Sequence, residues 1–308
     1  MRVPGGDDPL VMRAIQVAHF GGPEVLRCVE VERPSPISTE VLVRVIAAGV
    51  NPVDCKTRRG EGVARWVGPP PFILGWDVCG VVEAMGYGVT RFEVGDLVYG
   101  MPWFPRVAGA YAEFVTAPSR QLARVPDGIS PVEAAAIPLA AITAMQSLID
   151  TAHILNGQTV LVHGAGGGVG HLAVQIAKLR GAHVVATTGR RDREALQTRD
   201  ADVALDLVGG QDTQTLVATL REGGVLLAVS DGANAAVRAE AKRRRIRVEE
   251  PLVEPDGHWL DELGEAIAAR KLKVSVQETF TLERAAAAHE RLERGGVRGK
   301  LVLEVSPR

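Results

Sequence analysis

A glycine-rich stretch in the middle of the chain has the residue types and spacing of a phosphate-binding loop. In "VLVHGAGGGVGHLAVQIAK" (160–178), five glycines fall within seven positions, after β-forming residues and before helix-forming residues. Ala165, Gly167 and Gly170 occupy the three positions of the G-x-G-x-x-G fingerprint, with alanine at the first. These small residues allow a tight turn, an open backbone beside a diphosphate, and close packing of helix on strand.

The helix that follows this turn directs its free N–H groups at the phosphates. We therefore predict that the stretch binds a dinucleotide; the alternative is a turn with a structural role only. The predicted cofactor-binding residues here are Ala165, Gly166, Gly167, Gly168, Val169 and Gly170.

The end of the next β-type run bears on which nicotinamide dinucleotide is bound. An acidic residue that binds a free ribose 2′-hydroxyl is expected there, but the chain has "TTGRR" (187–191). Hydroxyl and guanidinium groups bind a 2′-phosphate by charge-assisted hydrogen bonds, whereas a carboxylate repels it. We predict NADPH as the cofactor, held by Thr188, Gly189, Arg190 and Arg191. The alternative is that the arginines begin a solvated helix.

The composition of the 308 residues disfavours several other function classes. With 35 basic and 37 acidic side chains, the chain gives no reason to expect nucleic acid or an anionic membrane as a partner. The sequence contains no run of eighteen apolar residues, so we predict no membrane span. Residues 1–11 lack the apolar core of a signal peptide and are predicted to be a disordered extension. Cys28, Cys55 and Cys79 fit neither a disulfide framework nor a metal knuckle, so we expect a reduced, cytoplasmic protein.

Two kinds of sequence pattern predict two domains. From Met12 to about Pro126, short β-type runs separated by Gly, Pro and Asn indicate a small antiparallel, barrel-like unit. Helical periodicity then alternates with apolar runs, which are typical of strands buried on both faces of a parallel sheet. The four runs are 159–164, 183–188, 203–208 and 225–230. The β-type segments after about Lys271 are predicted to fold back onto the first unit.

Motifs spread over nearly the whole chain resemble those of one known family. They are "FGGPEVL" (20–26), "AAGVNPVDCKTRRG" (47–60), "LGWDVCGVVEAMGYGVTRFEVGDLVYG" (74–100), "GAYAEFV" (109–115), "AITAMQSL" (141–148), the glycine stretch, "DLVGG" (206–210) and "RGKLVLEV" (298–305). Together they resemble the zinc-free quinone oxidoreductase branch of the medium-chain dehydrogenase/reductase family. The resemblance implies an α/β protein with a GroES-like β-barrel catalytic domain (12–130 and 272–308), a doubly wound Rossmann domain (131–271), and an active site in the cleft between them.

The residues at the family's zinc positions argue against a metal. Zinc-dependent relatives have a cysteine where this chain has Asn51, and Gly-His-Glu where it has Gly75, Trp76 and Asp77. A catalytic zinc needs three N, S or O protein ligands, and an amide and an indole do not supply them. The four-cysteine lobe of a structural zinc is also missing, so we predict no metal.

Without a metal, hydrogen-bond donors must polarise the substrate, and hydride comes from the nicotinamide. This favours reduction of a quinone or of the C=C bond of an α,β-unsaturated carbonyl, because the negative charge spreads onto an enolate or hydroquinone oxygen. Asn51 and Lys56 are the candidate catalytic donors, and a surface lysine is the alternative for Lys56. Cys55 is interpreted as a small buried hydrophobe, and the sequence does not identify the proton donor.

The resemblance implies further cofactor contacts. They are Thr143 on the ribose or phosphate side, Val208 and Gly209 beside the ribose, Ser230 near the nicotinamide and Lys300 at a phosphate. For Thr143 the alternative is a core residue inside a helix. His171, in the first turn of the phosphate helix, is interpreted as structural.

The segment between the second and third apolar runs of the Rossmann domain is short. Only about fourteen residues separate 183–188 from 203–208, whereas the family has room there for an extra strand and helix. In the strand order 3-2-1-4-5-6, strand three lies at an edge, so we predict a five-stranded sheet with a more open adenine side. The opposite edge, near 245–250, is where relatives dimerise, and a homodimer is expected. The competing functions are a non-redox scaffold or binding protein that kept the fold, and a zinc alcohol dehydrogenase.

Overall fold

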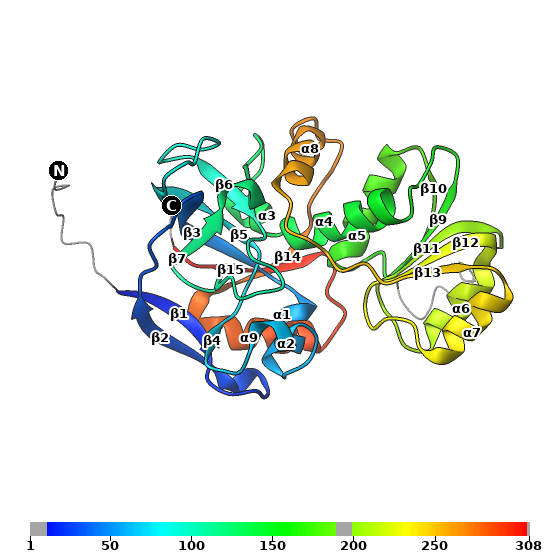
Figure 1. Ribbon diagram of the computed structural model, residues 1–308, viewed down its shortest axis with the longest axis horizontal. Coiled ribbons are helices and arrows are strands. Elements are labelled where there is room, and N and C mark those ends of the chain that lie inside the picture. The colour runs from blue at the N-terminus through cyan, green and yellow to red at the C-terminus, as the bar shows by residue number, and fades with distance from the viewer. Residues whose placement is uncertain (1–10, 189–198, 307–308) are drawn as a thin grey trace.

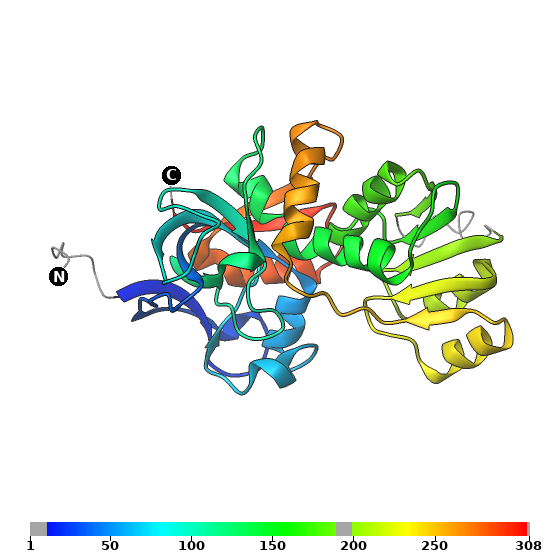
Figure 2. The ribbon, with the colours of Figure 1, turned by 45° about the horizontal axis from the view of Figure 1, so that its top comes forward.

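The computed structural model describes residues 11–188 and 199–306. Figure 1 shows two units side by side along the long axis of the molecule. One is rich in β-strands and contains both ends of the chain. The other is an α/β unit formed by the middle of the chain, and α8 (Gly257–Ala268) lies across the junction between them in both views (Figures 1 and 2).

The β-rich unit is built on two sheets. The larger has the order β14-β15-β3-β5-β6-β8, with β7 also paired to β3, and the smaller has the order β2-β1-β4. Its strands are β1 (Val11–Val17), β2 (Leu26–Glu32), β3 (Glu40–Val50), β4 (Phe72–Ile73), β5 (Val78–Met85), β6 (Leu97–Gly100), β7 (Phe114–Pro118), β8 (Leu122–Arg124), β14 (Val276–Thr281) and β15 (Lys300–Glu304). Its helices are α1 (Pro52–Arg58), α2 (Ala64–Val67), α3 (Pro131–Ala135) and α9 (Ala285–Glu293), with 3₁₀ turns at Pro23–Val25, Ser119–Gln121 and Leu282–Arg284.

The C-terminal segment returns to the β-rich unit, as expected from the sequence. β15 pairs antiparallel with β3, with Leu301 opposite Val50, and β14 runs parallel to β15. The last strand therefore begins where β3 ends and α1 starts. This pairing brings Lys300 to the base of α1.

The α/β unit contains a five-stranded sheet in which every pair is parallel, with the order β10-β9-β11-β12-β13. The strands are β9 (Thr159–His163), β10 (His183–Thr187), β11 (Ala201–Asp206), β12 (Leu220–Ala228) and β13 (Arg247–Glu249). The helices are α4 (Pro138–Met145), continued by a π-helical turn (Gln146–Thr151), α5 (Gly168–Leu179), α6 (Asp212–Thr219) and α7 (Ala235–Arg243).

Three of the four apolar runs of the sequence are the central strands β9, β11 and β12, and the fourth, 183–188, is the edge strand β10. In β9, Val160 and Val162 pack into the large core shared with α5, whereas Leu161 packs into a second core with residues of α6 and α7. Successive side chains of a strand point to opposite faces. Both faces of β9 are therefore covered, and no polar side chain interrupts the run.

The predicted shortening of the sheet is confirmed. In the strand order 3-2-1-4-5-6, β10 corresponds to strand two, and it forms the edge of the sheet in the part of the chain that the structure describes. The central pairings of β9 with β10 and β11 remain complete. The domain boundaries assigned from the sequence stay predictions. Every helix within the described ranges is too short or too polar to span a bilayer.

Gly170 lets α5 lie directly on the turn that precedes it. A Cβ atom at this position would lie 2.1 Å from the backbone oxygen of Gly164, which is closer than atoms can approach. By contrast, a Cβ at Gly166 would meet nothing nearer than Thr188 Cβ at 3.8 Å. Gly170, at the third position of the fingerprint, thus allows α5 to pack closely on the turn.

We predict that Gly170→Ala destabilises the protein by about 3 kcal/mol, because the added methyl forces the helix off the turn. The better helix propensity of alanine, about 1 kcal/mol, does not offset this. Urea unfolding without cofactor measures the effect, with Gly166→Ala as the matched control, expected to unfold near wild type. Equal stability of the two variants would contradict the close-packing role of Gly170.

Candidate active site

A cavity of about 660 Å³ is lined by residues of both units. On one side lie the glycine turn and the ends of β11 and β12, and on the other lie α1, α2 and the end of β3. Ligand sites of open α/β sheets lie outside the carboxyl ends of the strands. The cavity has this position and is the candidate active site.

The glycine turn presents an open backbone to the cavity. Gly167 is the N-cap of α5, so the first-turn N–H groups have no acceptor within the helix. The turn is held from outside: Ala165 N–H donates to Thr187 O (2.8 Å), and Gly166 O accepts from Gly299 N–H (2.9 Å). His171 also fixes it, with Nδ1 against Gly167 O (3.0 Å) and Nε2 accepting from Ser275 N–H (3.3 Å). The turn fits a diphosphate, and Ala165–Gly170 are the residues that would hold it.

The residues predicted to distinguish NADPH are described only in part. Thr187 is buried, and its hydroxyl is bonded to His163 Nδ1 (2.7 Å). Thr188 follows β10 beside Gly166 of the turn. Gly189, Arg190 and Arg191 lie outside the described residues.

Of the other predicted cofactor residues, Thr143 and Ser230 line the same cavity, whereas Val208 and Gly209 follow Leu207, which lines it. The N–H groups of Val208 (3.1 Å) and Gly209 (2.9 Å) donate to Asp206 Oδ1, which fixes the loop after β11. Thr143 is buried in α4 but lines the cavity, and Ser230 follows β12. Their roles as cofactor contacts stay predictions.

Asn51 lies in a buried polar cluster at the start of α1. Its Nδ2 donates to Asp77 Oδ2 (2.9 Å), and its Oδ1 accepts from Lys300 Nζ. Lys300 Nζ also bonds Asp77 Oδ2 (3.1 Å), while Asp77 Oδ1 accepts from Leu139 N–H (2.7 Å). The amide is therefore held in one orientation. One N–H of its NH₂ group has no partner in this cluster.

Lys300 connects this cluster to the glycine turn. Its side chain is 3 % exposed, and a Cβ at Gly168 would lie 2.9 Å from Lys300 Cδ. The stem thus lies on the first residue of α5, while the ammonium group lies between Asn51 and Asp77. The structure brings together the predicted phosphate loop, Asn51 and Lys300, although the ammonium group contacts Asn51 and Asp77 rather than the turn.

Lys56 crosses the cavity from α1 to the end of β12. Its Nζ donates to Ser230 O (3.1 Å) and pairs with Asp231 Oδ1 (2.8 Å). The side chain is 30 % exposed, lines the cavity and joins the two units, and its role as a catalytic donor stays a prediction. Cys55, next to it, is buried, and burial raises the pKa of its thiol to about 12. It is a thiol at neutral pH, as the sequence interpretation expected.

The residues at the family's zinc positions do not form a zinc site. The indole N–H of Trp76 donates to Arg106 O (2.7 Å), and its ring packs edge-on against Phe104. The Asn51 amide is bonded within its own cluster. Within residues 11–188 and 199–306, no three His, Cys, Asp or Glu side chains are grouped so that they could hold a metal ion.

A buried chain of hydrogen bonds supports Asn51 from behind. Asn51 N–H donates to Asp54 Oδ2 (2.7 Å), and Tyr111 donates to the same oxygen (3.0 Å). Tyr111 also contacts His289 Nε2 (3.4 Å), whose Nδ1 lies 3.2 Å from Arg58 Nη1. Because arginine only donates, His289 Nδ1 accepts, and Nε2 carries the ring proton.

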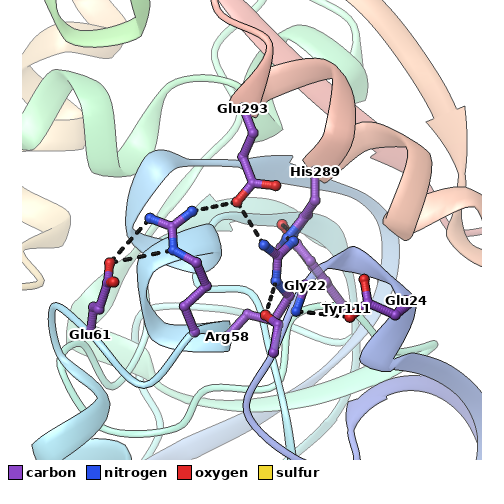
Figure 3. A network of polar contacts seen from close by, with 9 residues as sticks. Gly22, Glu24, Arg58, Glu61, Tyr111, His289 and Glu293 are labelled. Carbon is purple, nitrogen blue, oxygen red and sulfur yellow. Dashed lines mark hydrogen bonds and ion pairs between the residues drawn. The ribbon is translucent and has the colours of Figure 1, made fainter.

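The far end of this chain reaches the surface at Glu293. Arg58 Nη2 donates to Glu293 Oε1 (2.6 Å), and Arg58 Nε donates to Gly21 O (3.1 Å) (Figure 3). Sequence reasoning did not single out Asp54, Tyr111 or His289. The spacing Asn51-x-x-Asp54, which forms a capping box at the start of α1, was the available signal for the first of them.

Burial determines the protonation of Asp54 and His289 in this series of hydrogen bonds. It raises the pKa of Asp54 to about 7, although the hydrogen bonds from Asn51 and Tyr111 act in the opposite direction. Asp54 Oδ1 has no hydrogen-bond partner within the described residues. Burial, with the nearby Arg58, lowers the pKa of His289 to about 3, so this ring stays neutral.

We predict that Asp54→Asn changes the pH dependence of stability. The folded protein holds a proton on Asp54 up to about pH 7, whereas the unfolded chain loses it near pH 4, so ionisation costs wild-type stability as the pH rises through this window. His289 acts in the opposite direction over nearly the same window, so the difference between variant and wild type must be measured. The variant should gain roughly 1.4 kcal/mol per pH unit relative to wild type between about pH 4 and 7.

Urea unfolding at several pH values gives this difference. Above about pH 8 the two curves should run parallel, because Asp54 is ionised in both states of the wild-type protein. A difference that does not change with pH across the window would refute the assignment of Asp54 as the titrating group.

Comparisons with known proteins agree with this geometry. Residues 38–127 match the family model of the alcohol dehydrogenase GroES-like domain, and residues 180–303 match that of zinc-binding dehydrogenase. A chloroplastic quinone-oxidoreductase homolog of Spinacia oleracea is 32% identical over 327 residues, which cover 96% of this chain and 98% of that protein.

Solved structures give the same result. The quinone oxidoreductase of Coxiella burnetii has a TM-score of 0.88 and 34% identity, covering 96% of this chain and 100% of its own. A mycobacterial protein in complex with NADPH has a TM-score of 0.82 and 29% identity, and the match covers 95% of this chain and 99% of that one. One family model is named for zinc, but the residues described above do not fit that metal. The protein is an oxidoreductase that uses a nicotinamide dinucleotide, and the chain belongs to the quinone oxidoreductase-like branch of the medium-chain dehydrogenase/reductase family.

Proposed function

We propose that the protein is an NADPH-dependent reductase of quinones or of the C=C bond of α,β-unsaturated carbonyls, and that it works without zinc. The observation that carries this proposal is the single cavity that joins an open glycine turn to the polar groups of Asn51, Lys56 and Lys300. No cluster of metal ligands accompanies them within the described residues.

The side chains supply donors to a developing oxyanion. The nicotinamide, when bound, supplies the hydride. Asn51 uses one amide N–H on Asp77, and Lys56 uses two of its three N–H groups on Ser230 O and Asp231. Each keeps one donor for a substrate oxygen. Fixed donors of this kind stabilise an enolate or hydroquinone oxygen as the charge forms.

NADPH rather than NADH follows from the end of β10. Residues 188–191 (TGRR) contain two arginines and no carboxylate where a ribose-binding acid would stand. Thr188 lies beside Gly166 of the turn, and Gly166 and Gly167 leave the backbone open. Guanidinium and hydroxyl groups there favour a 2′-phosphate.

We also propose a homodimer and a cytoplasmic location. The edge of the sheet at β13 is unpaired in the described part of the single chain, and an open edge pairs readily with a second copy. No disulfide joins the three cysteines, of which Cys28 is exposed. We expect sedimentation velocity to give twice the mass of one chain; a monomer at micromolar concentration would contradict the dimer.

We predict NADPH-dependent turnover with quinones and enones, followed as loss of the reduced-nicotinamide absorbance. NADH should bind at least about tenfold more weakly, since it lacks the phosphate that the arginines bind. Fluorescence titration gives both affinities. Tight NADPH binding without turnover of any acceptor would favour the non-redox alternative, and dependence on added zinc would overturn the metal-free mechanism.

Lys56→Met tests the donor assignment. Loss of one fixed donor should lower kcat by about 10²-fold. The matched control is Lys178→Met, which removes an exposed lysine of α5 and should leave kcat unchanged. Equal kcat values for the two variants would remove Lys56 from the catalytic groups.

A further inference from the structure

The charged side chains that line the cavity all have one sign. Lys56, Arg65 and Lys300 are the ionised residues of its described lining, and no Asp or Glu side chain is among them. Two of these cations are neutralised by carboxylates just outside the lining, Lys56 by Asp231 (2.8 Å) and Lys300 by Asp77 (3.1 Å).

Arg65 differs from the two lysines. Its guanidinium lies over the ring of Trp66, 3.8 Å from the ring centroid. It forms no ion pair with any carboxylate in residues 11–188 and 199–306. A guanidinium stacked on an aromatic ring is held in plane and keeps its N–H groups for a bidentate acceptor.

Arg65 lines the same cavity as the proposed catalytic groups, on the side formed by α1 and α2. Between α1 and α2 the chain folds back toward Lys56. Glu61 N–H donates to Lys56 O (2.9 Å), and a Cβ at Gly62 would lie 3.2 Å from Lys56 Cβ. α2 lies beside α1 in the β-rich unit, whereas α5 begins in the other unit (Figure 1). The cation of the lining that lies on the glycine turn is Lys300. Arg65 thus enters the cavity from the side of α1 and not from the side of the glycine turn.

Large apolar side chains line the same cavity as Arg65. Trp66 is 42 % exposed and Leu252 is 50 % exposed, and both line the cavity. The buried side chains of Val63 and Phe104 line it as well. Large apolar side chains left open around one cavity mark a binding surface for an apolar molecule.

We propose that Arg65 and Trp66 bind an anionic substituent of the acceptor, so that the preferred substrates are apolar enones or quinones that carry a carboxylate away from the reducible bond. This inference rests on the proposed function and names its substrate class. The carboxylate accepts two N–H groups of the guanidinium, while the apolar body lies against Trp66 and Leu252.

The test compares two enones that differ only by a carboxylate group, benzalacetone and its para-carboxy derivative, with NADPH as reductant. For the wild-type protein, KM for the carboxylated enone should be about tenfold lower, the size expected of hydrogen bonds to a charged group. Arg65→Gln should raise that KM about tenfold while leaving kcat and the KM for benzalacetone unchanged. Arg65→Lys should restore part of the loss, because it keeps the charge without the planar fork.

A binding measurement separates this inference from the proposed function. Calorimetry with the saturated analogues, benzylacetone and its para-carboxy derivative, needs no turnover. The carboxylated analogue should bind about tenfold more tightly to wild type, and Arg65→Gln should abolish the difference. Arg27→Gln, which removes an exposed arginine of β2 outside the cavity, is the matched control and should behave as wild type.

Three results would overturn the inference. Equal affinity of wild type for the charged and neutral analogues removes the anion site. An equal loss with Arg27→Gln assigns the effect to overall charge. A rise in the NADPH dissociation constant with Arg65→Gln, without a change in carboxylate preference, makes Arg65 a cofactor contact. If neither enone is reduced while the carboxylate preference in calorimetry persists, the proposed reaction fails and the anion site stands.

Discussion

The side chain of Lys300 is the point at which the two units meet and at which the C-terminal strand contacts the N-terminal half of the β-rich unit. Its ammonium group is buried between Asn51 Oδ1 and Asp77 Oδ2, while its stem lies on Gly168 at the start of α5. A buried ammonium group without a partner would be strongly unfavourable. Asp77 supplies the opposite charge, and Asn51 supplies a neutral acceptor. The backbone pairing of β15 with β3 brings this cation to its partners, and its stem on Gly168 links the cluster to the start of α5.

The same cluster accounts for the chemistry that the site favours. In zinc-dependent relatives the resemblance places ligands at the positions of Asn51 and Trp76. Here the first is an amide bound to Asp77 and the second is an indole bound to Arg106 O. Positive charge at the base of the cavity comes from a lysine that is already neutralised. Such a site stabilises a delocalised oxyanion better than a localised alkoxide, which supports quinone and enone reduction over reduction of simple ketones.

Next to Asn51, hydrogen bonds connect Asp54 through Tyr111 and His289 to Arg58, and burial favours the neutral form of both titratable groups in this series. Burial makes the imidazolium unfavourable and also opposes the carboxylate, so the pKa of His289 falls and that of Asp54 rises. The neutral histidine accepts from Arg58 and donates toward Tyr111, which in turn donates to Asp54. Every link runs in one direction. The helix start that carries Asn51 is thereby held by hydrogen bonds from two other parts of the β-rich unit.

The sequence by itself determined the features that depend on neighbouring residues. The glycine spacing in 164–170 predicted the strand-turn-helix, the apolar runs predicted a parallel sheet buried on both faces, and the short segment after 183–188 predicted five strands. The residue types at positions 51 and 76 were enough to argue against a metal. The turn and the buried strands are local, because their geometry and burial are set by the residues in place. The five strands and the argument against a metal also needed the comparison with the family that the sequence resembles.

Only the tertiary structure decided which distant side chains meet. Asn51 and Lys300 are separated by 249 positions, Arg58 and His289 by 231, and Lys56 and Asp231 by 175. No periodicity or spacing encodes such contacts, since they follow from the pairing of β15 with β3 and from the docking of the two units. For the same reason the sequence could place Lys300 at a phosphate by resemblance but could not find its contacts with Asn51 and Asp77. The sequence placed the segment 56–72 at the pocket but did not single out Arg65, because a four-residue helix in a loop has no pattern from which its direction can be read.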